Sequence, residues 1–172
     1  MNNSDDLLFG DEPAEAAATA EAPAAPKSLG AWKVLLVDDE KEVHSITKIA
    51  LSDFSFEEKN IEFLHAYSAR EANDLIGKHP DTALILLDVV MESEDAGLRV
   101  VKHVREVLKN NMARIILRTG QPGQAPERKV ILDYDINDYK TKTELTSQKL
   151  FTTVVAALRA YRDIKIIDSN KK

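Results

Sequence analysis

Cysteine is absent from this chain of 172 residues, which excludes disulfide bonds and thiolate metal sites. Long apolar runs are absent too: runs such as 83–87 have the length of a strand, whereas a membrane helix needs roughly 20 apolar residues. The acidic N-terminus lacks the basic segment of a secretory signal. We therefore expect a globular protein of the cytoplasm without membrane contact. The four histidines lack the spacing of metal ligands and are predicted to be surface or hydrogen-bonded residues: His44, His65, His79 and His103.

A surplus of basic residues is missing as well. The first 30 residues hold six acidic residues and one lysine, a charge of −5. The other 142 residues hold 23 acidic and 22 basic residues, a charge of −1. A nucleic-acid surface would show a clear basic excess, so we expect no direct contact with nucleic acid.

Residues 1–30 are predicted to be a disordered, acidic tail rich in alanine and proline. Within it, residues 13–26 include eight alanines and three prolines, too little large apolar surface to offset the entropy cost of ordering the chain. The tail holds one small apolar segment, residues 7–9 (Leu-Leu-Phe), between acidic residues. This segment is either part of a solvated tail or a docking motif for another domain or partner.

From Trp32 onward, short apolar runs typical of strands alternate with segments that have apolar residues at helical spacing. Five such pairs require parallel strands joined by right-handed crossovers. The expected fold class is α/β, a flavodoxin-like (βα)5 doubly wound parallel sheet of five strands in the order 2-1-3-4-5, over residues 32–162. In chain order, the expected elements are strand Lys33–Asp38, helix Glu40–Phe54, strand Asn60–Tyr67 near an edge, helix Ala69–Lys78, central strand Thr82–Asp88, helix Gly97–Asn110, strand Ala113–Thr119, helix Pro126–Tyr134, strand Ile136–Lys140 and helix Thr146–Ile167. The apolar positions of the first helix are Val43, Ile46, Ile49, Ala50 and Phe54.

Polar side chains gather where the predicted strands end. Strand one ends in Asp38-Asp39, strand three in Asp88 and strand four in Thr119, and Lys142 follows strand five. The carboxyl ends of parallel strands share one edge of the sheet, where ligands of such folds bind. Three crowded carboxylates resist full ionisation unless a hard divalent cation such as Mg²⁺ relieves their repulsion. The sequence therefore predicts a magnesium site at this edge.

The same side chains suit phosphoryl transfer. A carboxylate can accept a phosphoryl group as an acyl phosphate, and a metal ion neutralises the charge on its oxygens. Lys142 can pair with one phosphate oxygen as a point charge, and the hydroxyl of Thr119 can donate to another. Because these two groups bind the phosphate, their positions can also signal whether the phosphate is present.

Four motifs resemble the receiver domain of bacterial two-component response regulators. They are V-L-L-V-D-D-E at 34–40, L-I-L-L-D-V-V-M at 84–91, I-L-R-T-G at 116–120 and N-D-Y-K-T-K at 137–142. The resemblance covers about residues 32–162. It implies a signalling domain rather than an enzyme, one that catalyses only its own phosphorylation and dephosphorylation. A sensor histidine kinase or a phosphotransfer protein would be the donor.

The resemblance assigns metal and acceptor roles at the strand ends. It implies that Asp88 is the phosphoacceptor and that Asp39 binds Mg²⁺ directly. Asp38 would support the ion, often through water. The backbone carbonyl of Val90, two residues past the acceptor, would be a third protein ligand.

Three further residues would act on the phosphoryl group or respond to it. Thr119 would be the switch hydroxyl, drawn inward by phosphate on Asp88, and Tyr139 the switch aromatic that fills the space. Lys142 rather than Lys140 would be the catalytic lysine, because the family places three steps between the aromatic residue and the lysine. The face formed by the receiver's fourth helix, fifth strand and fifth helix would then change its preference for an output domain or partner.

The sequence departs from the family pattern in three places. Thr143 follows Lys142 where the family usually has a cis-proline, so we expect a trans peptide bond there. The loop after Met91 is one residue longer and adds acidic residues near the site. Arg118 stands where an apolar residue is usual, and strand alternation predicts that it points away from Thr119.

The last helix is predicted to pack on the sheet through one stripe and to continue past the receiver. Isoleucines persist at 164, 166 and 167, beyond the point where the receiver is complete. Residues 163–172 are therefore predicted to form a helical extension or a linker, which either makes a homodimer contact or leads to an output domain. The sequence resembles receivers at the N-terminus of longer regulators, some of which carry an HD-type cyclic-dinucleotide phosphodiesterase. The stripe consists of Leu150, Val154, Leu158 and Tyr161.

Two other functions remain open. One is a docking module of receiver fold that is not phosphorylated. The other is a haloacid-dehalogenase-type phosphatase, which also uses an aspartyl phosphate and Mg²⁺. Such phosphatases need two acids at i and i+2 after the first strand, whereas Asp38 and Asp39 are adjacent.

Overall fold

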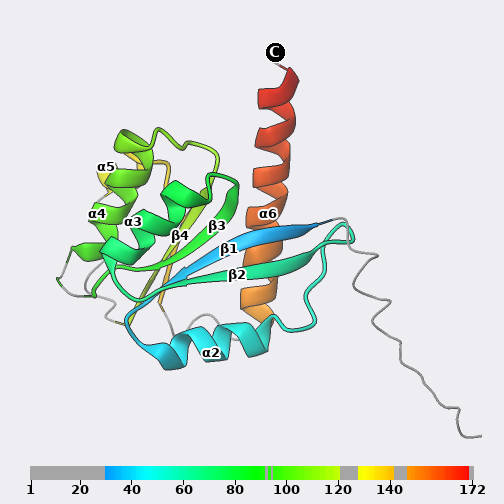
Figure 1. Cartoon of the computed structure of the whole chain (residues 1–172), viewed down its shortest axis with the longest axis horizontal. Coiled ribbons are helices and arrows are strands. Elements are labelled where there is room, and N and C mark those ends of the chain that lie inside the picture. Colours follow the sequence, from blue (N-terminus) through cyan, green and yellow to red (C-terminus); the bar gives the residue numbers. More distant parts are fainter. Residues whose placement is uncertain (1–29, 92, 94, 121–127, 142–146, 171–172) are drawn as a thin grey trace, which may run out of the picture.

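A computed structural model describes residues 30–91, 93, 95–120, 128–141 and 147–170. The predicted tail, apart from Gly30, lies outside these residues, and so does Lys142 with its bond to Thr143. Strands and helices alternate as predicted (Figure 1). In chain order, the elements are β1 (Ala31–Val37), α2 (Lys41–Ala50), β2 (Asn60–Ala66), α3 (Ala69–Lys78), β3 (Thr82–Asp88), α4 (Ala96–Lys102) with a π-helical turn (His103–Val107), β4 (Arg114–Thr119), α5 (Arg128–Asp133), β5 (Asp138–Thr141) and α6 (Ser147–Asn170).

The five strands form one parallel sheet in the order β2-β1-β3-β4-β5, which confirms the predicted fold class and strand order. β3 lies at the centre, and all seven of its residues are buried, as expected for an apolar strand covered on both faces. The less apolar β2 forms an edge, as predicted. Because every strand runs in the same direction, all five carboxyl ends lie along one edge of the sheet.

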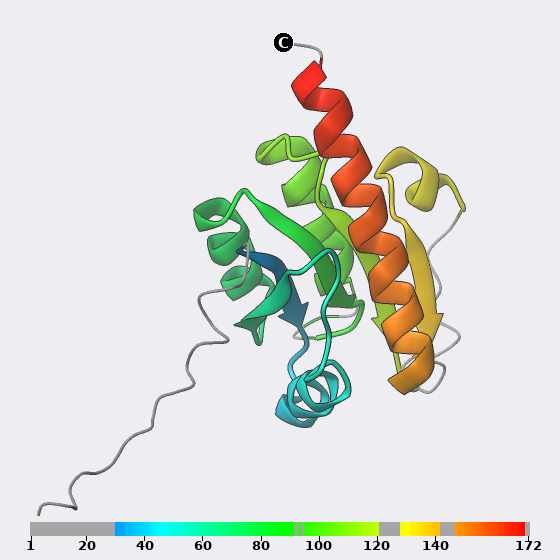
Figure 2. The ribbon, with the colours of Figure 1, turned by 90° about the vertical axis from the view of Figure 1, so that its right-hand side faces the viewer.

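Helices cover both faces of the sheet. Figure 2 shows α6 crossing one face, which it shares with α2, while α3 and α4 pack on the other. Successive residues of β3 point to opposite faces, because side chains alternate along a strand. Leu84 and Leu86 pack on the side of α2 and α6, whereas Ile85 and Leu87 pack on the side of α3 and α4.

The inner face of α2 is polar although the helix has apolar positions. Ile46 and Ile49, two of the apolar positions named from the sequence, are 64% and 73% exposed and do not face the core. The buried positions of α2 are polar instead, namely His44 and Thr47. The helix lies beside the polar edge of the sheet, and its inner face carries side chains that hydrogen-bond to groups at that edge.

Several predicted boundaries are also wrong. The helix predicted as Glu40–Phe54 ends at Ala50. The helix predicted as Gly97–Asn110 ends at Val107 with a π-helical turn, His103–Val107, a feature that apolar spacing does not reveal. The fifth strand begins at Asp138 rather than at Ile136. The side chain of Asn137 accepts a backbone N–H of β4 at 2.6 Å, and this bond replaces a regular ladder bond at the start of the strand.

The predicted stripe of α6 is confirmed, because all four of its residues are buried. The helix continues to Asn170, and its last turns extend beyond the sheet (Figures 1 and 2). Ile166 and Ile167 on these turns are 53% and 57% exposed. In the part of the chain that the structure describes, no helix combines the length and the apolar character needed to cross a membrane.

Candidate functional site

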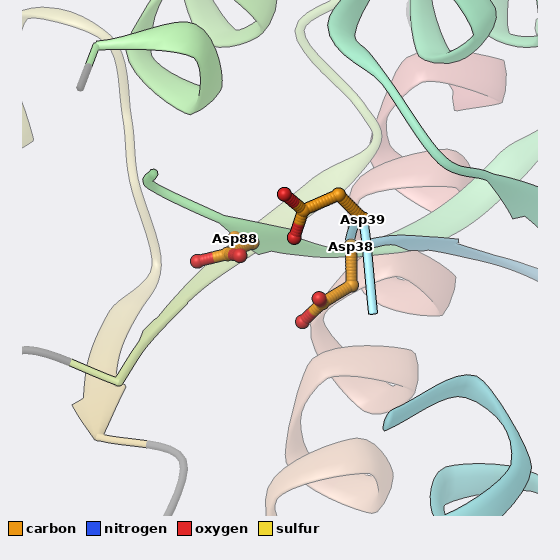
Figure 3. A group of neighbouring side chains, drawn as sticks. All are labelled: Asp38, Asp39 and Asp88. Carbon is orange, nitrogen blue, oxygen red and sulfur yellow. The ribbon is translucent and has the colours of Figure 1, made fainter. Parts of the chain in front are cut away.

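Asp38, Asp39 and Asp88 lie together at the carboxyl edge of the sheet (Figure 3). One carboxylate oxygen from each lies within 4.8 Å of the others. Asp38 and Asp39 directly follow β1, and Asp88 ends the neighbouring strand β3, so the pairing of these strands brings the acids side by side. Asp38 and Asp88 are buried, whereas Asp39 is exposed. The structure thus brings together the three acids that the sequence analysis identified.

Backbone amides near the acids orient two of the carboxylates. The amide of Glu40 donates to Oδ1 of Asp38 at 2.9 Å. The amide of Val90 donates to Oδ1 of Asp88 at 3.3 Å. Each bond comes from the residue two positions further along, which is the usual geometry of an aspartate in a turn. The chain itself therefore fixes the direction of both side chains.

Gly97 allows α4 to begin directly beside the end of β3. Its amide donates to the carbonyl oxygen of Val89 at 2.9 Å. A Cβ atom here would overlap the carbonyl oxygen of Asp88 and would lie 2.8 Å from Cα of Val89. This role was not predicted from the sequence, in which the one available signal was a glycine in the first turn of a predicted helix.

A pocket of about 360 Å³ lies beside the acids. Asp39 and Asp88 form part of its wall, together with Val90 in the loop after β3 and Thr119 at the end of β4. The remaining lining residues among those described are Glu40, Met91 and Gly120. Four of the predicted site residues therefore face one shared space.

Tyr139, a further predicted site residue, is placed differently. Tyr139 lies on β5 opposite Leu117, and its partly buried ring packs against the core on the side of α3 and α4. It is not among the described residues that line the pocket. Lys142 lies outside the described residues. The switch role of Tyr139 and the catalytic role of Lys142 therefore stay predictions.

His44 on α2 is connected to the site through the backbone. It is buried, and its Nε2 donates to the carbonyl oxygen of Asp38 at 2.8 Å. Its Nδ1 lies 2.8 Å from Nδ1 of His65 on β2, and its ring packs at a tilt against the ring of Tyr67 with 4.3 Å between centroids. Burial, followed by His44 and Lys48, lowers the pKa of His65. This histidine pair therefore joins α2, β2 and the backbone of the acidic loop.

Arg118 lies on the opposite side of β4 from Thr119, as predicted. Its Nη1 donates to Oγ1 of Thr47 on α2 at 3.2 Å, whereas Thr119 lines the pocket. The arginine is 5% exposed. Burial lowers the pKa of Arg118, and the carboxylates of Asp38 and Asp88 act in the opposite direction. The guanidinium therefore lies within electrostatic range of two of the three acids.

Comparison with known proteins identifies relatives of this chain. The family described as "Response regulator receiver domain" matches residues 34–155. Among curated proteins, the chain is 48% identical over 164 residues to "3'3'-cGAMP-specific phosphodiesterase 2" of Vibrio cholerae. That match covers 95% of this chain but 31% of the relative, so the chain spans about a third of the relative's length.

Solved structures share the fold at low sequence identity. The N-terminal domain of a response regulator/sensory box/GGDEF 3-domain protein from Carboxydothermus hydrogenoformans has a TM-score of 0.63 at 21% identity, over 76% of this chain and 97% of that chain. The signal receiver domain of an HD domain-containing protein from Pseudomonas fluorescens Pf-5 has a TM-score of 0.61 at 20% identity, over 77% and 98%. The family match covers well over half of the sequence, and the chain therefore belongs to the response-regulator receiver domain family.

Proposed function

We propose that Asp88 accepts a phosphoryl group from a sensor histidine kinase or a phosphotransfer protein. The observation that carries this proposal is the placement of Asp88 at the end of the central strand, beside two further acids and in one pocket with Thr119. In the transfer, a carboxylate oxygen of Asp88 attacks the phosphorus atom of a phosphohistidine. The phosphorus–nitrogen bond breaks, the imidazole leaves, and an acyl phosphate forms.

The donor atoms at the site fit Mg²⁺. Hard divalent cations prefer oxygen ligands, and three carboxylate oxygens within 4.8 Å of one another supply them. Asp39, Asp88 and the backbone carbonyl of Val90 would hold the ion directly, and Asp38 would hold it through water. When bound, Mg²⁺ offsets the negative charge on the phosphoryl oxygens.

Three predicted residues would respond to the phosphoryl group. The hydroxyl of Thr119 would donate to one phosphoryl oxygen and Lys142 would pair with another, while Tyr139 would fill the space that Thr119 leaves. The surface that changes would be the face of α5, β5 and α6, which are the fourth helix, fifth strand and fifth helix of the receiver. Such a change shifts the population of two states rather than the fold.

We further propose that this receiver controls a phosphodiesterase output in a cytoplasmic regulator. Support comes from the curated relative, which is named a phosphodiesterase and is about three times as long as the matched chain. The continuation of α6 to Asn170, with Ile166 and Ile167 exposed, gives a helix that could connect to such a domain or pair with a second copy. Phosphorylation at Asp88 would act on that connection through α6.

Incubation of the wild-type chain with acetyl phosphate tests the proposed phosphorylation. We expect a slower band on a Phos-tag gel when Mg²⁺ is present, and none after EDTA removes the metal. Hydroxylamine should abolish the band, because it cleaves acyl phosphates. A chain that never shifts with Mg²⁺ would instead be the unphosphorylated docking module.

Asp39→Asn is expected to weaken Mg²⁺ binding by about tenfold or more, because a charged contact contributes roughly 1.5–3 kcal/mol and tenfold corresponds to about 1.4 kcal/mol. Isothermal titration calorimetry with MgCl₂ gives the dissociation constant directly. Asp53→Asn, which changes an exposed acid away from the site, is the matched control. Equal loss of affinity in both variants would show a diffuse charge effect instead of a ligand at Asp39.

A further inference from the structure

We propose that Arg118 is a positioning residue of the acceptor site, a built-in cation that offsets part of the acidic charge and sets how tightly the site binds Mg²⁺. The inference rests on the proposed function, because it concerns the same three acids. It extends that function by assigning a role to a residue outside the pocket wall, at a position where the family usually has an apolar side chain.

Strand register places Arg118 in one row with two of the acids. Asp88 and Arg118 are direct partners across β3 and β4. Val37 and Leu87 are partners in the preceding row of β1 and β3, so Asp38 follows in the same row as Asp88. Adjacent strands lie about 4.8 Å apart, and residues in one row of a parallel sheet point to the same face. The row is therefore acid, acid and base across three neighbouring strand ends.

The face that this row shares is the one covered by α2 and α6. Leu36, Leu86 and Ile116, each two residues before a member of the row, all belong to the core on that side. The contact between Arg118 and Thr47 of α2 gives the same direction. Arg118 therefore approaches the acids from the side opposite to Thr119.

Within the described ranges, the hydrogen bonds of Arg118 leave part of its guanidinium without a partner. Nη1 donates to Oγ1 of Thr47, and that hydroxyl in turn donates to the carbonyl oxygen of Val43 at 2.7 Å. Nη2 is buried and has no hydrogen-bond partner among the described residues. By contrast, the buried Arg105 donates to three backbone carbonyl oxygens. A buried cation with so few bonds is costly unless nearby negative charge compensates it.

Asp38 and Asp88 supply that negative charge, and Arg118 in turn offsets part of the charge of the acids. With Arg118 included, the three ionised acids carry a net charge of −2 instead of −3. The same positive charge repels an incoming divalent cation, so the site holds Mg²⁺ less tightly than three acids alone would.

Mg²⁺ titrations of two Arg118 variants at pH 8 test this inference. Arg118→Gln removes the charge but keeps a donor for Thr47, and we expect it to bind Mg²⁺ about 5- to 10-fold tighter than wild type, since removing a like charge at this range is worth roughly 1 kcal/mol. Arg118→Lys keeps the charge, so its dissociation constant should lie closer to that of wild type. Backbone amide NMR shifts of Val90 and Gly120 report binding and show that each variant is folded. Arg118→Met replaces Gln if the Gln variant does not fold.

Arg114→Gln is the matched control for a purely structural effect. Arg114 begins the same strand, β4, and is 4% exposed. At that end of the strand its guanidinium donates hydrogen bonds to Met112, Asn111 and Asp135. Its loss should lower stability without changing Mg²⁺ affinity. In the Arg118→Gln variant alone, Mg²⁺ should raise the melting temperature by more than it does in wild type.

The outcomes separate the two proposals. Suppose that wild type binds Mg²⁺ and beryllofluoride, and that both the Gln and the Lys variant of Arg118 bind Mg²⁺ with the affinity of wild type. The inference is then wrong and the proposed function stands. If wild type binds neither ligand, the proposed function fails, and the inference fails with it.

Discussion

Replacement of Asp88 by Asn is expected to abolish phosphorylation, lowering its rate by about 1,000-fold or more, the scale on which enzymes lose activity with their nucleophile. The amide has no ionised oxygen to attack phosphorus, and it removes one of the proposed metal ligands. Asn has nearly the same shape, and its oxygen can still accept the amide of Val90, so the fold should persist. The loss would therefore be chemical rather than structural.

The measurement is the rate of Phos-tag band formation with acetyl phosphate and Mg²⁺. Asp81→Asn is the control, because Asp81 is an exposed acid just before the same strand, at the end away from the site. That variant should react at the wild-type rate. A shifted band that persists in Asp88→Asn would contradict the assignment of the acceptor.

Gly97→Ala is expected to destabilise the chain by roughly 1–3 kcal/mol, the usual cost of overpacking. The new Cβ would overlap the carbonyl oxygen of Asp88, so either α4 or β3 must shift. Both shifts move groups that line the site, and phosphorylation should slow as well. Urea unfolding followed by circular dichroism gives the change in the free energy of unfolding.

Gly77→Ala is the counterpart in a different helix. A Cβ at Gly77 would meet nothing within 4 Å, and the residue lies in α3. Alanine there should stabilise the chain by about 0.5–1 kcal/mol, because it lowers the entropy cost of forming the helix. If both variants gained stability, the close approach of Gly97 to Asp88 would be wrong.

The fold was predictable because its signals are local and repeated. The run at 83–87 is entirely apolar and Asp88 follows it, which marks both a buried central strand and an acid at its end. Once five strand–helix pairs are recognised, the topology follows from the rules of parallel sheets. The convergence of Asp38, Asp39 and Asp88 then needs only the fact that parallel strands end at one edge.

The missed features depend on contacts between distant residues, which periodicity does not encode. The apolar spacing of α2 favoured Ile46 and Ile49, yet the helix buries His44 and Thr47 because Asp38 and Arg118 offer them hydrogen bonds across the fold. Strand alternation predicted the direction of the Arg118 side chain, but not that its charge would act on Asp38 and Asp88. The role of Gly97 depends likewise on a close approach between α4 and β3.

The central claim is that the loops after β1 and β3 form one site for a cation and a phosphoryl group. A crystal structure with Mg²⁺ and beryllofluoride, a mimic of the phosphoryl group, tests it most directly. We expect beryllium bonded to a carboxylate oxygen of Asp88 and Mg²⁺ held by Asp39, Asp88 and the carbonyl oxygen of Val90. Well-ordered ions bound elsewhere, with the Asp88 carboxylate unmodified, would contradict the claim.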